Sequence, residues 1–313
     1  MKIAIVGAGL AGLGLAYFLL QEEGHEVTLF DSRGIGGGAS GVCSGLLHPY
    51  PGFAAKRSSY ASEALMITKG LIKVAEAYTP EIVARQNGIL RQAQSPEQKE
   101  MLLSHCAEFG DIEQMEEEAF LIHSGITVSL SGYLNGLWNY CKAKGAHLLI
   151  EKIEALAALS HFDEVVVAAG YGVKRFFPDE KLQFLKGQSL LLEGTPPFEK
   201  SWIGRGYISH LGTPSSFEVG STYERYFTHE APSEAVAKQL LEANLSAYGK
   251  GAKVVGCKAG IRVASPSSYL PVIQKMDGRV HLFTGLGSRG LLYHGYYGRL
   301  LANRILSKNR QLA

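Results

Sequence analysis

The pattern of apolar and polar positions is most regular at the N-terminus. Ile3–Val6 is a short, mostly β-branched run, which is typical of a buried strand. A glycine-rich turn at residues 7–12 follows, and a helical pattern then extends from about Leu10 to Glu22. A second apolar run, Glu26–Phe30, ends at Asp31. This order predicts the strand, tight turn, helix and second strand of a nucleotide-binding unit.

The rest of the chain alternates between helical and extended periodicity. Apolar residues at helical spacing predict five further helices, at 58–78, 96–109, 132–144, 233–248 and 291–306. Ser95 and Ser131 are the predicted N-caps of the second and third of these. Strands are predicted at 89–92, 147–153, 164–168, 188–192, 206–210, 217–221 and 281–284. The acidic run 113–118 is interpreted as a solvated face rather than as a metal site.

These elements predict an α/β fold built from both ends of the chain. The first glycine-rich turn is N-terminal, and a second strand–loop–helix with many glycines lies near the C-terminus. The turn-rich, alternating section between them predicts an antiparallel sheet in an inserted α+β domain. The nucleotide-binding domain is predicted at residues 1–55, 124–180 and 257–313, and the substrate domain at 56–123 and 181–256.

The turn Gly7-Ala8-Gly9-Leu10-Ala11-Gly12 fits the pattern G-x-G-x-x-G. Its first glycine permits the tight turn, its second lets a pyrophosphate approach the backbone, and its third lets the helix pack closely on the sheet. The helix N-terminus offers free N–H groups to the phosphates. Asp31 is expected to bind a ribose hydroxyl, which argues against NADP and leaves FAD and NAD. The alternative is a glycine-rich turn that binds no ligand.

The segment after Asp31 is too rich in glycine for a regular helix or strand. It is interpreted as a loop that faces a phosphate or a flavin, and the alternative is a flexible connector. Its candidate binding residues are Ser32, Arg33, Gly38, Ala39 and Ser40.

Composition narrows the class of protein without identifying it. The chain has 313 residues, of which 46% are hydrophobic and 19% charged, as in ordinary globular enzymes. A net charge of +2 does not by itself indicate nucleic-acid binding. The four cysteines form no C-x-x-C pair, which argues against a zinc site or a disulfide framework and suits a reducing cytoplasm. No apolar stretch is long enough to predict a transmembrane helix.

Five stretches together resemble one family, the D-amino-acid-oxidase-type flavoproteins, which include glycine oxidase, sarcosine oxidase and D-amino-acid dehydrogenase. They are Lys2–Asp31, Gly38-Ala39-Ser40, Ala168-Ala169-Gly170, Lys186-Gly187-Gln188, and Gly260-Ile261-Arg262 with Gly285–Gly290. The resemblance covers nearly the whole chain in order. It implies FAD as the cofactor and a GR2-type FAD-binding, Rossmann-like domain with an inserted antiparallel-sheet substrate domain.

Two further stretches are similar to the FAD domain of the bifunctional MnmC-type enzymes, which modify tRNA uridines. They are Gly206-Tyr207-Ile208 with Val219–Tyr223, and Gly260-Ile261-Arg262 with Tyr269-Leu270-Pro271. MnmC proteins carry a methyltransferase domain ahead of this one. Because this chain starts at the first FAD strand, it is expected to be the oxidase domain alone, with a separate SAM-dependent methyltransferase as a partner.

The resemblance implies an FAD-dependent oxidation of an amine beside a carboxylated carbon. In the tRNA branch the substrate is the carboxymethylamino group of the wobble uridine, cmnm5(s2)U, and the products are glyoxylate and an aminomethyl group. The first alternative is a glycine, sarcosine or D-amino-acid oxidase or dehydrogenase. The second is a flavin-binding protein without turnover. A tRNA substrate requires a basic rim, for which the candidates are Lys56, Arg57, Lys174, Arg175, Lys250, Lys253 and Lys258, although scattered surface lysines are the ordinary interpretation.

The resemblance also implies roles for particular residues. Arg262 is expected to bind the substrate carboxylate, because a guanidinium offers bidentate geometry. Tyr207 is expected at the pocket wall, and Arg289 at the flavin or the substrate. No metal ligand is expected. The remaining candidate cofactor contacts are Leu46, His48, Ile153, Ala169, Gly170, Gly285, Gly287, Ser288, Arg289, Gly290 and Leu291.

Overall fold

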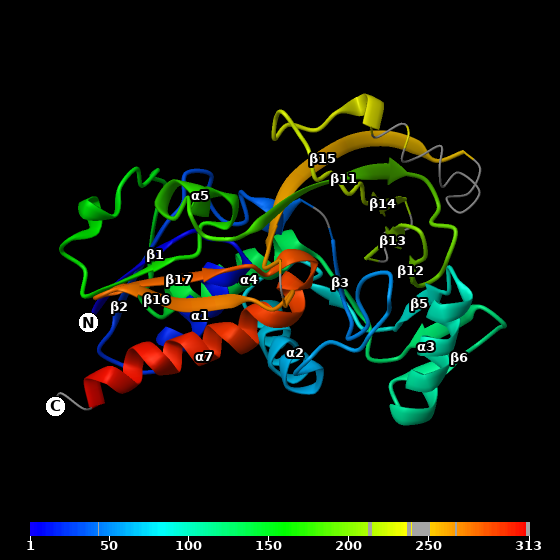
Figure 1. Cartoon of the computed structure of the whole chain (residues 1–313), viewed down its shortest axis with the longest axis horizontal. Helices are drawn as coiled ribbons and strands as arrows, with labels where there is room; N and C mark the ends of the chain where they lie inside the picture. Colours follow the sequence, from blue (N-terminus) through cyan, green and yellow to red (C-terminus); the bar gives the residue numbers. More distant parts are fainter. Residues whose placement is uncertain (43, 212–214, 237–238, 240–250, 267, 311–313) are drawn as a thin grey trace.

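The structure is a computed structural model that describes residues 1–42, 44–211, 215–236, 239, 251–266 and 268–310. Figure 1 shows a lobe with a parallel sheet and long helices beside a lobe with an antiparallel sheet. Two long strands, β11 (Gln183–Glu193) and β15 (Lys253–Ala264), arch from one lobe to the other. The N-terminus lies beside the parallel sheet.

Six strands form the first sheet, in the order β16–β17–β10–β1–β2–β9. Five are parallel, and the edge strand β16 runs antiparallel to β17. Ile3 pairs with Val27 on one side and with Glu164 on the other. The strands are β1 (Lys2–Val6), β2 (Glu26–Phe30), β9 (His147–Leu149), β10 (Glu164–Val167), β16 (Val272–Asp277) and β17 (Val280–Thr284).

Both faces of this sheet are buried, which explains its nearly unbroken apolar strands. Ile3 and Ile5 join the main core cluster on one face, whereas Ala4 and Val6 join a smaller cluster on the other. In the core, α1 contacts α4 and α7, and α2 contacts the same two helices. The helices are α1 (Leu10–Leu19), α2 (Ala61–Ala77), α4 (Leu130–Ala143) and α7 (Gly290–Arg310).

Eight strands form the second sheet, in the order β15–β11–β14–β13–β12–β5–β7–β6. Neighbours are antiparallel except β12 and β5, which run parallel. β11 and β15 pair from Gln183 and Ala264 at one end to Glu193 and Lys253 at the other. The other strands are β5 (Ile89–Gln92), β6 (Ile112–Gln114), β7 (Ala119–Ile122), β12 (Ser201–Ile203), β13 (Tyr207–Ser209) and β14 (Ser216–Gly220).

A small antiparallel sheet, in the order β3–β8–β4, contacts both larger units. A Cβ on Gly45 of β3 would lie 2.5 Å from Leu291 Cδ2 at the start of α7. The Thr127 hydroxyl of β8 lies 2.7 Å from the Ser201 hydroxyl of β12. The strands of this sheet are β3 (Gly45–Leu47), β4 (Ala84–Arg85) and β8 (Ile126–Val128), and the remaining described helices are α3 (Pro96–Glu108) and the short α5 (Val173–Phe176).

The structure confirms the predicted fold class and most local elements. The strands predicted at 26–30 and 89–92 have the predicted bounds as β2 and β5. Ser95 caps α3, since its hydroxyl accepts a hydrogen bond from Gln98 N at 3.2 Å. The acidic run 113–118 is exposed, as expected for a solvated face.

Three predicted boundaries are wrong for identifiable reasons. α1 ends at Leu19 rather than Glu22, because the chain turns toward β2 through Gly24 at φ +83°. The N-cap of α4 is Ser129 rather than Ser131, because the Ser129 hydroxyl accepts the N–H of Gly132 at 3.3 Å. β9 ends at Leu149 rather than at residue 153, because its partner β2 ends opposite it.

The sequence pattern did not predict every element. β15 was not predicted, because Gly256 and Gly260 interrupt the alternation of its side chains. The predicted domain boundary between residues 256 and 257 falls inside this strand. The helix predicted at 233–248 lies largely outside the described residues. Among the helices that are described, none is both long and apolar enough to cross a lipid bilayer.

Close packing of α2 and α4 yields a stability prediction. A Cβ on Gly136 of α4 would lie 2.4 Å from the carbonyl oxygen of Ala75 in α2. Because the helices must separate to admit it, we expect Gly136→Ala to lower the free energy of unfolding by about 1–3 kcal/mol. In the control Gly70→Ala, nothing lies within 4 Å of the new Cβ, and we expect a gain of about 0.5–1 kcal/mol. Equal urea midpoints for the two variants would contradict this packing.

The buried imidazole of His294 yields a pH prediction. Its Nδ1 donates to Leu291 O at 3.0 Å, and its Nε2 accepts from the Tyr133 hydroxyl at 2.6 Å. Burial lowers the pKa of His294 to about 4, whereas an unfolded histidine titrates near pH ~6.5. Between pH ~6.5 and the folded pKa of about 4, the unfolded chain binds a proton that the folded chain does not. The contribution of His294 to the free energy of unfolding is therefore complete above this pH range and is lost as the pH falls through it.

We expect the variant His294→Gln to lose less stability than the wild type on acidification from neutral pH. Urea midpoints measured across this interval give the comparison. If the urea midpoints of the two proteins changed equally with pH, His294 would not contribute to the acid sensitivity of the fold.

Candidate functional site

The carboxyl ends of four parallel strands meet at one edge of the six-stranded sheet. Gly7 follows β1, Asp31 follows β2, Ala168 follows β10 and Gly285 follows β17. From β1 the chain passes to β2 on one side and later to β10 on the other, so the strand order reverses at β1. Ligands of open α/β sheets bind at such a position.

The glycine turn at this edge has no room for side chains. Gly7 adopts a φ of +117°, and a Cβ on it would lie 2.3 Å from the carbonyl oxygen of Ala168. A Cβ on Gly12 would lie 1.9 Å from Gly7 O, and one on Gly9 would lie 2.8 Å from Ser40 Oγ. The turn therefore keeps bare backbone at the start of α1.

Asp31 and Ser40 are held against this turn by backbone donors. The Asp31 carboxylate accepts the N–H of Ala8 at 2.9 Å and that of Arg33 at 2.8 Å. The Ser40 hydroxyl accepts the N–H of Leu10 at 3.1 Å. The segment between them is therefore anchored at both ends to the glycine turn.

β15 joins the two sheets above this edge. It contacts three short turns, at Ala39–Gly41, Gly170–Gly172 and Gly287–Arg289. A Cβ on Gly260 of β15 would lie 2.9 Å from Ala39 Cα. The end of the strand pairs with the third turn through an isolated bridge between Ala264 and Leu286. All three turns contain predicted cofactor contacts.

The eight-stranded sheet presents a polar face to these turns. Side chains alternate along a strand, and directly paired residues share a face. Ile208, Phe217 and Val219 therefore lie on one face, where they form an apolar cluster with neighbouring strands. Glu218 lies on the other face, and its carboxylate accepts the N–H of Ser44, which follows the first turn. Tyr207 shares this polar face.

Arg262 and Tyr207 both reach the end of β14. Arg262 Nη2 donates to Ser221 Oγ at 2.9 Å, and a Cβ on Gly187 would lie 2.7 Å from the same nitrogen. The Tyr207 ring covers Gly220, where a Cβ would lie 2.5 Å from its Cζ. Within the described chain no carboxylate lies at ion-pair distance from Arg262, so this half-buried guanidinium is available to an anionic ligand.

Arg289 points to a different neighbour. Its Nη1 donates to Tyr269 O at 3.4 Å, and its guanidinium carbon lies 5.8 Å from the centroid of the Tyr269 ring. The described contacts of Arg289 do not include Arg262, Tyr207 or Ser221. The structure therefore groups Arg262 with Tyr207 and leaves Arg289 at the third turn.

The remaining predicted contacts occupy two kinds of position. Gly170, Gly285 and Gly287 have left-handed φ values of 53°, 76° and 55° in the turns at the carboxyl edge. The other predicted contacts differ in exposure. Ile153 and Leu291 are buried, Leu46 is half-buried and Ser288 is exposed.

His48 is buried beside Arg91. Burial and the nearby Arg91 guanidinium lower the pKa of His48 to about 3, so the ring is neutral at physiological pH. His48 Nδ1 accepts the N–H of Tyr50 at 3.3 Å. A neutral, inward-facing imidazole supplies no charge for a phosphate.

The residues proposed as a basic rim have varied partners. Arg57 pairs with Asp111 at 3.2 Å, Lys174 lies 4.7 Å from the centroid of the Phe184 ring, and Arg175 pairs with Glu154. Lys250 lies outside the described residues. Three of the proposed rim residues are therefore engaged in contacts within the chain.

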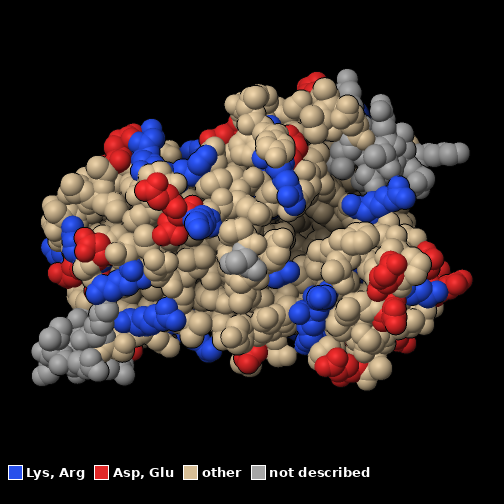
Figure 2. Space-filling model, in the orientation of Figure 1, with Lys and Arg blue, Asp and Glu red and all other residues tan. Residues whose placement is uncertain are grey.

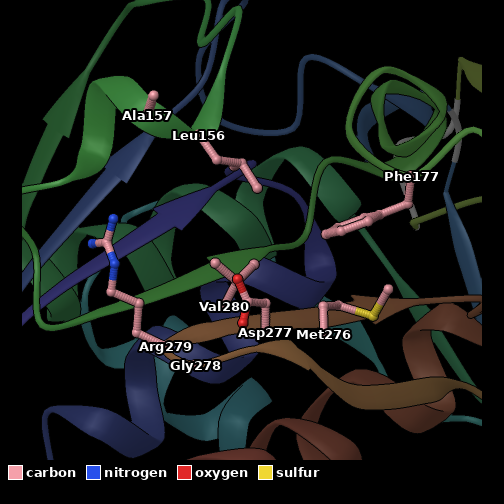
Figure 3. A pocket seen from close by; sticks show the side chains of 8 residues that line it. All are labelled: Leu156, Ala157, Phe177, Met276, Asp277, Gly278, Arg279 and Val280. Atoms are coloured by element: carbon pink, nitrogen blue, oxygen red, sulfur yellow. The ribbon is translucent and has the colours of Figure 1, made fainter.

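Figure 2 shows that the molecule is hollowed between its two lobes, below the arch of β11 and β15, with basic side chains around the hollow. A separate open cavity of about 720 Å³ is shown in Figure 3. Leu156, Ala157, Phe177 and the hairpin 276–280 line it. It lies at the amino-terminal edge of the parallel strands, opposite the glycine turns, and therefore does not belong to the candidate site.

Sequence reasoning missed Ser221 and Glu218, which position Arg262 and the turn at Ser44. The alternation in β14 contained the signal, since Phe217 and Val219 are apolar and Glu218 lies between them. Among the described residues, no group of three His, Cys, Asp or Glu side chains is placed to hold a metal ion.

Comparison with known proteins agrees with this geometry. Residues 2–304 match the family model described as FAD dependent oxidoreductase (DAO). The tRNA 5-methylaminomethyl-2-thiouridine biosynthesis bifunctional protein MnmC of Maricaulis maris is 27% identical over 97% of this chain and 52% of its own length. The protein of the same name from Acinetobacter baylyi is 24% identical over 97% and 53%. The chain thus spans about half the length of the curated relatives it matches.

Solved structures show the same fold at lower identity. Glycine oxidase from Geobacillus kaustophilus has a TM-score of 0.84 and 18% identity, covering 98% of this chain and 95% of its own. Iminodiacetate oxidase from Chelativorans sp. BNC1 has a TM-score of 0.78 and 18% identity, covering 97% and 95%. Since the family model covers nearly the whole sequence, this chain belongs to the DAO family of FAD-dependent oxidoreductases.

Proposed function

We propose that this oxidoreductase acts on the carboxymethylamino group of the wobble uridine cmnm5(s2)U in tRNA. The carbon–nitrogen bond is oxidised and then hydrolysed, which releases glyoxylate and leaves an aminomethyl group. The observation that carries this proposal is Arg262, a half-buried guanidinium on the polar face opposite the cofactor turns. The names of the MnmC relatives, which place them in tRNA uridine biosynthesis, support the choice of substrate.

The turns at the carboxyl edge fit FAD. Side chains are excluded at Gly7 and Gly9, and α1 begins at Leu10 with Gly9 as its N-cap. The N–H of Leu10 donates to Ser40 Oγ, and the next N–H groups of the helix lie at the turn. We propose that Asp31 binds a ribose hydroxyl and that the phosphates lie at the start of α1. In the turn Gly287–Arg289 the Arg289 N–H donates to Leu286 O at 3.0 Å, so we expect the N–H groups of Gly287 and Ser288 to face the flavin. When bound, FAD supplies the acceptor for the two electrons of the oxidation.

The chain itself mainly positions the substrate. Arg262 binds the substrate carboxylate through charge-assisted hydrogen bonds, while the Ser221 hydroxyl fixes the guanidinium. This contact orients the carbon that lies between the carboxylate and the nitrogen. Tyr207 limits the freedom of that group from the neighbouring strand. The product amine suits a SAM-dependent methyltransferase, which we propose as the partner in the next step.

A small amino acid is the second candidate substrate. Glycine oxidase and iminodiacetate oxidase share this fold, and both names denote substrates with an amine beside a carboxymethyl carbon. Arg262 would bind their carboxylates equally well. The two candidates differ in what surrounds the amine, so a direct competition between substrates discriminates them.

Anaerobic reduction of the bound flavin tests the proposal. We expect tRNA that carries carboxymethylaminomethyl-uridine to bleach the flavin absorbance, and glycine, sarcosine and D-alanine to bleach it far more slowly. Bleaching by a small amine alone would establish the second candidate. Bleaching by none of them would favour a flavoprotein without amine turnover.

Arg262→Gln tests the carboxylate contact. Loss of a charge-assisted contact of about 1.5–3 kcal/mol is expected to raise KM for the carboxylated substrate by about 10- to 150-fold, while flavin content is retained. Lys275→Gln, which removes an exposed charge from the edge strand β16, is the matched control. An unchanged KM in Arg262→Gln would assign the substrate carboxylate to another residue.

Asp31→Ala tests the cofactor turn. We expect the dissociation constant for FAD to rise about 10- to 100-fold, because a charged acceptor next to the glycine turn is lost. In the control Asp163→Ala, a carboxylate that accepts the Lys2 N–H at 2.7 Å is removed from the opposite edge of the sheet. Flavin fluorescence on titration of apoprotein gives both constants. Equal losses in the two variants would indicate a general effect on β1 instead.

A further inference from the structure

The chain distributes its charge unevenly. Residues 243–313 contain eleven Lys and Arg and a single acidic residue, Asp277, although the whole chain has a net charge of only +2. The described part of this segment forms β15, β16, β17 and α7. Arg299 and Arg304 lie on the solvent side of α7, and Figure 2 shows basic side chains along this helix. Such a stripe attracts phosphates.

Exposed aromatic rings flank the beginning of the same helix. Tyr60, at the start of α2, is 50% exposed and stacks on Tyr296 of α7 with ring centroids 5.3 Å apart and planes at 17°. Tyr269 is 51% exposed and lies under the Arg289 guanidinium. One exposed tyrosine therefore lies beside Arg289 of the third cofactor turn, and the other lies against Tyr296 in the second turn of α7.

These rings are held in place at an energetic cost. Tyr60 and Tyr269 adopt left-handed φ values of 56° and 54°, which residues other than glycine rarely adopt. Residues kept in such conformations tend to occur at binding sites. Behind Tyr296, the buried ring of Tyr297 contacts Tyr293 and Tyr296, with centroids 5.6 and 5.4 Å away. The exposed ring of Tyr60 thus rests, through Tyr296, on a layer of packed tyrosine rings.

We propose that this aromatic–basic surface binds unpaired bases and their flanking phosphates in an RNA substrate. It consists of Tyr60, Tyr269, Arg289, Tyr296, Arg299 and Arg304. Every nucleobase has a π face that stacks on tyrosine, and guanidinium groups bind phosphates. The surface begins at the turn Gly287–Arg289 of the cofactor site, so an RNA whose wobble base enters that site extends along α7. The proposal rests on the tRNA substrate proposed above.

Binding of a labelled RNA to the holoenzyme tests the surface. The probe is a fluorescein-labelled anticodon stem–loop with an unmodified wobble uridine, followed by anisotropy. We expect the double variant Tyr60→Ala/Tyr269→Ala to bind about tenfold or more weakly, because two stacking faces are lost. The variant Tyr60→Phe/Tyr269→Phe keeps the rings and is expected to bind like the wild type. An unchanged flavin spectrum and melting temperature show that each variant is folded.

Tyr226→Ala is the matched control. Tyr226 is 96% exposed, in the segment whose Glu224 pairs with Lys186 of β11, away from α7. We expect its removal to leave RNA affinity unchanged. Wild-type affinity in the double alanine variant, or an equal loss in Tyr226→Ala, would overturn the proposal. Equal losses in the phenylalanine and alanine variants would also overturn it, since stacking does not require the hydroxyl.

Salt dependence tests the basic half of the surface. In Arg299→Gln/Arg304→Gln, the slope of log affinity against log salt is expected to fall by about 1.4, since each phosphate contact on a single strand contributes about 0.7. An unchanged slope would show that Arg299 and Arg304 do not contact the phosphates of the bound RNA.

The same variants separate this proposal from the proposed function. If the wild type oxidises modified tRNA and the tyrosine variants keep its KM, the surface is wrong and the function stands. If the wild type binds the stem–loop through the tyrosines but is reduced only by small amines, the surface stands and the substrate proposal is wrong. A higher KM for tRNA with nearly constant kcat in the alanine variant supports both.

Discussion

The pairing of β15 with β11 is the interaction on which the candidate site depends. Gly187 and Gly260 lie directly opposite each other in this pair. The absence of a side chain at Gly260 lets the strands approach Ala39, and its absence at Gly187 leaves room for the Arg262 guanidinium. Two paired glycines therefore set the distance between the antiparallel sheet and the nucleotide-binding edge. A strand pair without them would either stand away from the cofactor turns or displace the arginine.

The polar face of the eight-stranded sheet has an energetic consequence. Ser189, Ser201 and Ser209 are at most 4% exposed, and burial of a hydroxyl is unfavourable unless a hydrogen bond compensates it. Ser201 has that compensation from Thr127, whereas Ser209 Oγ has no hydrogen-bond partner among the described residues. Apolar residues share this face, because Leu191 pairs with Glu218 and Ile203 pairs with Tyr207. The buried Ser209 hydroxyl is therefore the feature of the face that a ligand between the sheet and the turns would explain.

The electrostatics favour positioning over proton transfer. His48 and His294 are buried and neutral at physiological pH, because desolvation lowers the pKa of His48 to about 3 and that of His294 to about 4. The positive charge near the candidate site comes from the guanidinium groups of Arg262 and Arg289. Such groups suit the binding of a carboxylate or a phosphate. The chemistry itself then belongs to the cofactor that the family requires.

The first 31 residues could be interpreted from sequence, because every signal there is local. The spacing of the glycines, the helix that follows and the position of Asp31 all depend on neighbours within one strand–helix–strand unit. Arg262 was different: no periodicity marked β15 as a strand, and only a family resemblance singled out the residue. Arg289 had the same support, yet the structure places it against Tyr269.

The sequence by itself determined the nucleotide-binding unit and the chemistry of its turn. Only the tertiary structure decided that Arg262, Tyr207 and Ser221 face the same space. They come from three distant segments, and each strand alternates its side chains between two faces. A shift of one residue in the pairing of β15 on β11 would turn Arg262 to the apolar side. That register is set by contacts between segments far apart in the chain, which no local pattern records.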